Sequence, residues 1–253
     1  METAAAGEPD GTGGDRYQGK AVTYGFFVTG TDTGVGKTLV ACALLHALAR
    51  SGLRAVGMKP VAAGARLRHG RLVNDDVEAL KAAGNVVAPD DLINPYCFEP
   101  PVAPHIAAAA IGVPIDLQRL RSAYLGLAAL ADCVVVEGAG GFRVPLGADF
   151  DTGDLAANLN LPVLLVVGMR LGCINHALLT AAAIRAAGLP LAGWIANHIE
   201  ADMTFGDENV RTLQERLRAP LVARIAYSAD PRPETIAYDL GMDSLRSARD
   251  RDA

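Results

Sequence analysis

The sequence predicts an α/β fold in which a mostly parallel sheet is wrapped by helices on both faces. Two observations predict it. Short runs rich in β-branched residues are hydrophobic almost throughout, which is typical of strands covered on both sides. Segments between them carry apolar residues at helical spacing. The expected strands are AVTYGFFVTG (21–30), RAVGMKPV (54–61), DCVVVEG (132–138), LPVLLVVG (161–168), LAGWIANH (191–198) and the weaker PLVARIAY (220–227). The expected helices are 38–52, 174–188 and 207–217.

The length and composition are those of a globular protein. A chain of 253 residues with 51% hydrophobic and 20% charged residues can bury a large core. We expect one domain over residues 21–241. Residues 1–20 are acidic and glycine-rich and residues 242–253 are polar, so we expect a disordered N-terminal extension and a frayed C-terminal tail.

Several classes of function are disfavoured. The net charge is −5 without a basic block, which argues against a nucleic-acid surface. No apolar run approaches the 18 residues of a membrane span. The four cysteines lie far apart, without zinc-ligand spacing, and are expected to be buried thiols in a reducing compartment. The first residues lack the basic and then apolar pattern of a secretory signal, so we expect a cytoplasmic protein.

The stretch GTDTGVGKT, residues 30–38, indicates a phosphate-binding loop. It follows an expected strand and precedes a helix that begins at Lys37, and this context supports a P-loop NTPase-like fold. We expect the backbone N–H groups and the Lys37 charge to bind phosphates, and the Thr38 hydroxyl to bind magnesium. The entrance departs from the usual pattern, because Thr31 stands where the first glycine belongs. An ordinary strand-to-helix turn is the alternative.

Three side chains are expected at the same edge of the sheet. Lys59 and Glu137 each end an expected strand, and ligands bind at that edge of open α/β sheets. Glu137 suits magnesium, but a helix-capping or ion-paired glutamate is the alternative, as a surface lysine is for Lys59. Asp76 is a second candidate ligand, although Asp75 and Asp76 could instead cap a helix.

Two further segments carry candidate binding residues. Residues 172–175 begin an expected helix, whose N-terminus would suit a carboxylate, with a plain N-cap by Asn175 as the alternative. The Pro-rich connection 94–105 is long and irregular, and such loops often carry function. Three histidines share no common spacing and are interpreted as polar residues near loops: His105, His176 and His198.

Together these motifs resemble the dethiobiotin synthetase family. The resemblance spans about residues 21–200 and rests on GTDTGVGKT, GMKPVAAG, NPYCFEPPVAPH, VVVEGAGG, LPVLLVVGMRLGCINHALLTAAAI and LAGWIANH. It implies an ATP- and Mg²⁺-dependent ligase of biotin biosynthesis. The implied reaction converts 7,8-diaminononanoate and CO2 to dethiobiotin, ADP and phosphate through a carbamate and a carbamic-phosphoric anhydride. The resemblance also implies a homodimer with the substrate site at the subunit interface.

The resemblance assigns roles to individual residues. Catalytic roles are implied for Lys59, Lys37 and Thr33. Metal binding is implied for Thr38, Asp76 and Glu137. Nucleotide contacts are implied for Gly34, Val35, Gly36, Lys37, Thr38, Leu39, Asp76, Glu137, Gly138, Ala139, Gly140, Asn197 and His198, with Asn197 at the adenine. Substrate contacts are implied for Ala63 and, from the other subunit, Gly172, Cys173, Ile174 and Asn175.

Some positions depart from the family pattern. Ala63 stands where serine is frequent, so a hydroxyl contact to the substrate is missing or replaced. Gly34 stands where some members have glutamate. Ala226 stands where proline is frequent, which leaves the adenine-side residues 226–228 unassigned.

Two other classes with such a loop compete with the synthetase. A partition-type ATPase switch would have no small-molecule product, but those proteins tend to carry a signature lysine where this chain has Asp32. An amide-forming ligase of the cobyrinate type usually has a glutamine-hydrolysing domain, for which this chain has neither the length nor a suitable Cys/His context.

Overall fold

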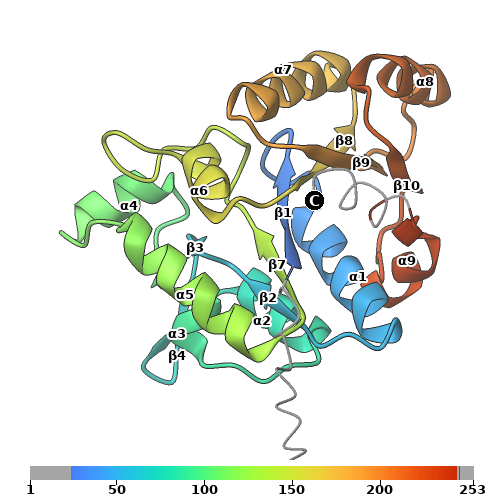
Figure 1. Cartoon of the computed structure of the whole chain (residues 1–253). Helices are drawn as coiled ribbons and strands as arrows, with labels where there is room; N and C mark the ends of the chain where they lie inside the picture. Colours follow the sequence, from blue (N-terminus) through green and yellow to red (C-terminus); the bar gives the residue numbers. More distant parts are fainter. Residues whose placement is uncertain (1–23, 244, 246–253) are drawn as a thin grey trace, which may run out of the picture.

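The computed structural model describes residues 24–243 and 245, and its centre is a six-stranded parallel sheet (Figure 1). The strands lie in the order β10-β9-β8-β1-β7-β2. Their bounds are β1 (Tyr24–Gly30), β2 (Ala55–Met58), β7 (Cys133–Glu137), β8 (Val163–Met169), β9 (Leu191–His198) and β10 (Leu221–Ile225). Five of them lie within the expected runs, and β8 ends one residue beyond its run, at Met169, so the predicted α/β class with a parallel sheet is confirmed.

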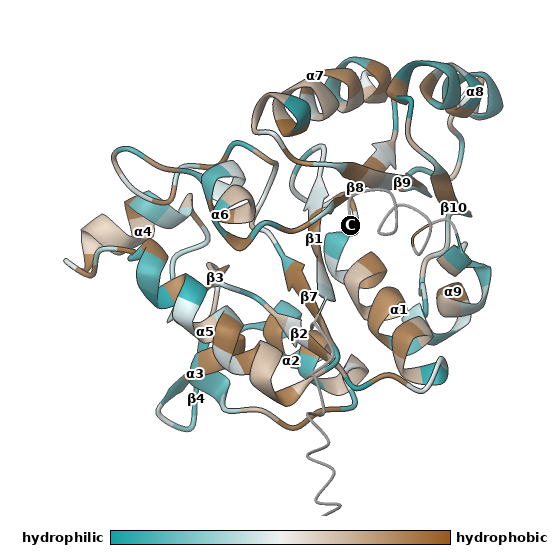
Figure 2. Ribbon diagram, in the orientation of Figure 1, coloured by the Kyte–Doolittle hydropathy of each residue, from teal (hydrophilic) through white to brown (hydrophobic). Residues whose placement is uncertain are grey.

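Helices cover both faces of the sheet, as expected. On one face lie α1 (Lys37–Arg50), α2 (Asp75–Ala83) and α9 (Pro233–Asp239). On the other lie α5 (Leu117–Leu130), α6 (Thr152–Leu159), α7 (Cys173–Ala186) and α8 (Gly206–Leu217). Neighbouring strand residues point to opposite faces of the sheet. Val166 belongs to the buried cluster that includes α1 (the α1 cluster), and Leu165 belongs to the buried cluster that includes α7 (the α7 cluster). In Figure 2 strands such as β7 and β9 are coloured as hydrophobic, whereas α7 and α8 mix hydrophobic and hydrophilic residues.

Smaller elements extend the β2 side of the molecule. They are β3 (Val61–Ala62), β4 (Arg66–Arg68), β5 (Arg71–Val73), α3 (Asp90–Ile93), β6 (Tyr96–Cys97) and α4 (Pro104–Ala110). The strand expected over 54–61 therefore stops at Met58 and resumes as β3 in another sheet. The Lys59 N–H donates to the carbonyl of Ile93 at 2.8 Å, and Pro60 has no N–H to continue the ladder. The Lys59 backbone thereby leaves the main sheet.

The expected helices are present, with ends shifted by one or two residues, but others were not expected. Helices α5 and α6 each begin at a capping aspartate. The Asp116 carboxylate accepts from the Gln118 N–H at 2.8 Å, and Asp151 forms a capping box with Asp154. These short-range signals, rather than the apolar pattern alone, mark where the two helices start.

The topology brings the loops that follow the six strands to one edge. Because all six strands are parallel, their carboxyl ends meet at the same edge of the sheet. The central strand β1 lies between β7 and β8, and the chain order reverses there. Such a switch point is where open α/β sheets bind ligands.

Parts of the predicted organisation stay predictions. The expected disordered extension, residues 1–20, lies outside the described residues, and of the expected tail 242–253 only 242, 243 and 245 are described. The extent of a single domain over 21–241 also stays a prediction. Within the described part of the chain, no helix has both the length and the apolar character needed to cross a membrane.

The packing of α5 gives a direct test of the core. Leu120 is fully buried against the β1, β2 and β7 face, whereas Leu125 on the same helix is exposed. We expect Leu120→Ala to lower the free energy of unfolding by about 2–5 kcal/mol, because the cavity does not refill. Leu125→Ala should change it by less than about 0.5 kcal/mol. Urea denaturation monitored by circular dichroism measures both, and equal effects would contradict the assigned faces.

Candidate active site

The loop after β1 ends at a helix start that offers free N–H groups to an anion. Gly36 is the N-cap of α1, with φ of 92° and no side-chain cap, so the first-turn N–H groups of α1 lack intrahelical partners. Asn197, buried at the end of β9, donates from Nδ2 to the Val35 carbonyl at 2.8 Å. This bond fixes the loop against the sheet, in the arrangement that a phosphate-binding loop needs.

Lys37 points into the loop that precedes it. Its Nζ donates to the carbonyl of Asp32 at 2.9 Å, and the side chain is buried. Burial, followed by the nearby Lys59 charge, lowers the pKa of Lys37 to about 8, against the raising effect of the surrounding carboxylates. The Asp32 carbonyl thus accepts a hydrogen bond from the ammonium that a phosphate oxygen could accept instead.

Lys59 lies at the centre of a charged cluster beside the loop. Its Nζ donates to Glu137 Oε1 at 2.6 Å and to Asp76 Oδ2 at 2.9 Å. Lys59 is only 4% exposed and Glu137 only 1%, so the surface-lysine alternative is wrong. Burial opposes the charge on Lys59, but the two carboxylates outweigh it and raise the pKa of Lys59.

Thr38 completes the cluster from the first turn of α1. Its Oγ1 lies 3.0 Å from Asp76 Oδ1 and 2.9 Å from Glu137 Oε1, and its one proton can be donated to only one of them at a time. Burial opposes ionisation of Asp76, but Lys59 and Thr38 prevail and lower the pKa of Asp76.

Asp76 can contact Thr38 and Lys59 because another residue caps its helix, α2. Asn74 is the N-cap of α2, and its Oδ1 accepts from the N–H groups of Asp76 and Val77. Asp75 and Asp76 do start α2, as the alternative expected, but the N-cap is Asn74 and not an aspartate. Asp75 points elsewhere, to Arg66.

The donor set fits a magnesium ion. Glu137 Oε2 is buried and has no hydrogen-bond partner among the described residues, which is costly for a carboxylate unless a cation completes it. Residues 24–243 and 245 contain no group of three His, Cys, Asp or Glu side chains that would hold a metal by themselves. Two carboxylates and a hydroxyl leave positions for phosphate oxygens and water, as magnesium prefers.

The loop and the cluster border one open cavity of about 800 Å³. Eleven expected site residues line it, in Thr33, Gly34, Gly36, Lys37, Thr38, Lys59, Ala63, Asp76, Glu137, Ala139 and Gly140. The sequence assigned no individual role to another part of the wall, which consists of residues 101–104 with Val61 and Val144. The irregular, Pro-rich stretch 94–105 was the available signal for it, since it includes most of that wall.

Other expected site residues lie around the cavity rather than on it. Val35 and Gly138 are buried behind the loops, and Leu39 packs beside the α1 cluster. Residues 172–175 lie at the start of α7, where the helix begins at Cys173 with Gly172 as N-cap. Asn175 is thus inside the first turn, and its interpretation as the cap is wrong.

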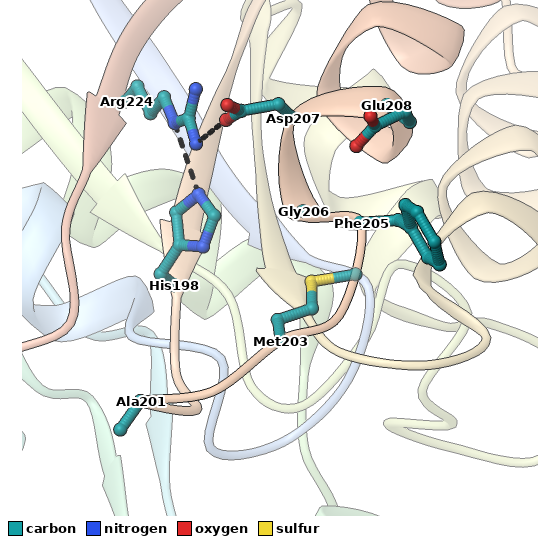
Figure 3. Close-up of a pocket in the computed structure, with 8 residues that line it drawn as sticks. All are labelled: His198, Ala201, Met203, Phe205, Gly206, Asp207, Glu208 and Arg224. Atoms are coloured by element: carbon teal, nitrogen blue, oxygen red, sulfur yellow. Dashed lines mark hydrogen bonds and ion pairs between the residues drawn. The ribbon is translucent and has the colours of Figure 1, made fainter.

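His198 belongs to a second, shallower pocket, shown in Figure 3. Arg224 donates from Nε to His198 Nε2 at 3.2 Å and is ion-paired with Asp207 at the start of α8. Burial, and then the Arg224 charge, lower the pKa of His198. The imidazole is therefore held as a neutral acceptor for Arg224.

The parallel sheet, the GKT loop at its switch point and the adjacent carboxylates define a P-loop NTPase-like protein. Solved structures with this fold include the ParA family ATPase from Chlorobium tepidum TLS, at 13% identity, TM-score 0.52, over 90% of this chain and 99% of that one. The MinD protein from Pyrococcus horikoshii OT3 is similar at 16% identity, TM-score 0.54, over 90% and 96% of the two chains. At these identities the likeness concerns the fold alone.

Closer comparisons identify the family. A family model described as an AAA domain matches residues 24–235. The ATP-dependent dethiobiotin synthetase of Aromatoleum aromaticum is 56% identical over 215 residues, which are 85% of this chain and 96% of that protein. The chain belongs to the family of ATP-dependent dethiobiotin synthetases. The roles that the resemblance assigns to single residues stay predictions.

The conformation of Gly36 gives a test of the nucleotide site. A Cβ at Gly36 would lie 2.3 Å from Asn197 Nδ2, on a residue with φ of 92°. We expect Gly36→Ala to weaken ATP binding about 100-fold or more, because backbone strain adds to the loss of the Asn197 bond.

Gly34→Ala is the matched control in the same loop. Gly34 also has a positive φ, 75°, but nothing lies within 4 Å of its Cβ position. Its substitution therefore adds strain alone and should cost less than about tenfold. Calorimetric titration with ATP compares the two variants, and equal losses would show that the Asn197 contact is unimportant.

Proposed function

We propose that this enzyme closes the ureido ring of dethiobiotin, using ATP, CO2 and 7,8-diaminononanoate, as a ligase of biotin biosynthesis. The family membership supports the reaction. The single observation that carries its mechanism is the convergence of two lysines, a hydroxyl and two carboxylates on one cavity beside the phosphate loop.

The first steps bring anions together. One amine of the diamine captures CO2 as a carbamate, whose oxygen attacks the γ-phosphorus of ATP while ADP leaves. Lys37 and Lys59 neutralise the charge that develops on the transferring phosphoryl group. Mg²⁺, held by Thr38, Asp76 and Glu137 in this proposal, would supply further charge neutralisation on the phosphates. Thr33, at the entrance of the loop, lies where it can contact the reacting groups.

The last step needs mainly proximity. The second amine attacks the carbonyl carbon of the mixed anhydride, the ring closes, and phosphate leaves. No covalent enzyme intermediate is required, because both amines belong to one bound molecule. Residues 101–104, which line the cavity, would limit the access of water to the anhydride. At Ala63 the cavity has a methyl group where a hydroxyl is frequent, so the backbone carries any polar contact there.

The start of α7 is the proposed site for the substrate carboxylate, contributed by the second subunit of a homodimer. Helix α7 is 14 residues long, its N-cap has no side-chain hydrogen bond, and its N-terminus attracts anions. Leu171 beside it is 97% exposed and Leu179 on the same helix is 62% exposed. We propose that the second subunit covers these two leucines.

The adenine contacts and the cellular location of the enzyme are also proposed. Asn197 lies directly behind the phosphate loop, where an adenine can follow the phosphates, and the adenine-side residues 226–228 line a neighbouring pocket in part. A cytoplasmic location is proposed because the reaction consumes ATP. The described cysteines are all free thiols, in agreement with a reducing compartment.

The reaction is tested by phosphate release from the purified protein with ATP, Mg²⁺ and bicarbonate. We expect release to require 7,8-diaminononanoate and to equal the dethiobiotin detected by mass spectrometry, because the acceptor of the phosphoryl group exists only with the diamine. Hydrolysis that proceeds equally without the diamine, and without product, would support a nucleotide switch instead.

A substitution of Lys59 tests ATP binding and catalysis separately. We expect Lys59→Ala to lower kcat about 100-fold or more and to change ATP affinity by less than about fivefold, since its partner charge develops during transfer. Steady-state kinetics measures kcat, and calorimetry measures the ATP affinity.

The control for this substitution is Lys81→Ala, because Lys81 also pairs with carboxylates but lies on the outer side of α2. It should leave both values unchanged. Thermal unfolding of each variant checks that the unpaired Glu137 has not unfolded the protein. Equal losses in kcat and affinity would show that Lys59 only binds the nucleotide.

A further inference from the structure

Asp32, at the entrance of the phosphate loop, connects that loop to a segment 138 residues further along the chain. Its carboxylate accepts from the Thr33 N–H at 2.7 Å through Oδ1 and from Arg170 at 2.6 Å through Oδ2. Its carbonyl holds Lys37 at 2.9 Å. One residue thus contacts the loop backbone, the loop lysine and an arginine beyond β8.

Arg170 lies in the turn between β8 and α7. Its carbonyl accepts from the Cys173 N–H at 3.0 Å, so the turn leads directly into the first residue of α7. The loop entrance is bound to β8 itself as well, because the Thr31 N–H donates to the Val166 carbonyl at 3.0 Å. The phosphate loop and the start of α7 therefore move relative to one another only if the Asp32–Arg170 pair adjusts.

Binding of ATP would change the contacts of Asp32. The Lys37 ammonium has three N–H donors, so a phosphate oxygen that binds it would either share it with the Asp32 carbonyl or replace that carbonyl, and both alter the hydrogen bonding of Asp32. Because the Asp32 carboxylate is paired with Arg170, the change reaches the turn before α7. The start of α7 is the proposed site of the substrate carboxylate, so two ligand sites share one ion pair.

We propose that Asp32 and Arg170 are positioning residues that couple ATP binding to diamine binding. This inference rests on the proposed function, because it requires the diamine to use the start of α7. Differential contact of each ligand with a shared element is what binding cooperativity needs. If α7 serves the site of the second subunit, the same pair connects the two active sites of the dimer.

The coupling is measured with a non-hydrolysable ATP analogue and Mg²⁺. Calorimetry gives the Kd of the analogue with and without saturating 7,8-diaminononanoate, and the ratio of the two values is the coupling factor. We expect at least about fivefold for the native chain, the lower end of typical couplings. Asp32→Asn, Arg170→Gln and the double variant should each fall below about twofold, and the double variant should lose no more than either single one.

Arg54 and Asp132 provide the matched control. They form an ion pair at 2.9 Å that is also partly exposed, but directly before β2 and β7, at the opposite edge of the sheet. Arg54→Gln, Asp132→Asn and their double variant should keep the native coupling factor. Thermal unfolding midpoints of all variants separate a general loss of stability from a loss of coupling, because the factor is a ratio within one variant.

Four results would overturn the proposal. Native coupling in Asp32→Asn and Arg170→Gln would show that the pair transmits nothing, and additive losses would show that the residues act separately. A native chain that binds the diamine with a coupling factor of one would reject the coupling and leave the proposed function intact. A native chain that does not bind the diamine at all would overturn both.

Discussion

The active-site edge is organised around a buried charge, the ammonium of Lys59. In the sheet, Met58 is in register with Val136, and Lys59 and Glu137 are the residues that follow them. The parallel pairing of β2 and β7 therefore places an ammonium and a carboxylate side by side as the two strands end. A buried charge without a partner destabilises a fold strongly, so this register, Asp76 and the cap of α2 depend on one another.

Such a cluster contributes less to stability than to chemistry. A buried ion pair is often no better for stability than well-packed apolar side chains, because both charges lose their water. Lys37 and Lys59 together balance Asp76 and Glu137, so the four groups attract an anion little through net charge. The attraction comes from the loop N–H groups and the start of α1, which are aimed at the cavity. The lysines instead supply charge that can be redistributed when phosphates enter.

The sequence predicts this site as far as local rules reach. Lys59 and Glu137 could be identified because each ends an apolar strand, and parallel strands end together. The role of Asp76 stayed open because it depends on whether Asn74 or an aspartate caps α2, a choice between neighbours that tertiary contacts decide. The Asp32–Arg170 pair was not predicted, since nothing local connects residues 138 positions apart. The contact of His198 with Arg224 was missed for the same reason.

The comparison with MinD and ParA shows how little the sheet alone determines. Those structures share the fold with this chain at 13–16% identity, and fold does not fix function. One position at the loop entrance bears on the choice between these classes. Where partition-type ATPases tend to carry a signature lysine, this chain has Asp32, whose carboxylate is occupied by Arg170 of the same chain. A lysine there would face Arg170 and meet like charge, so this turn of β8 favours a carboxylate at the entrance. The loop and the β8 turn are thus matched to each other, and through them the nucleotide site is matched to the start of α7.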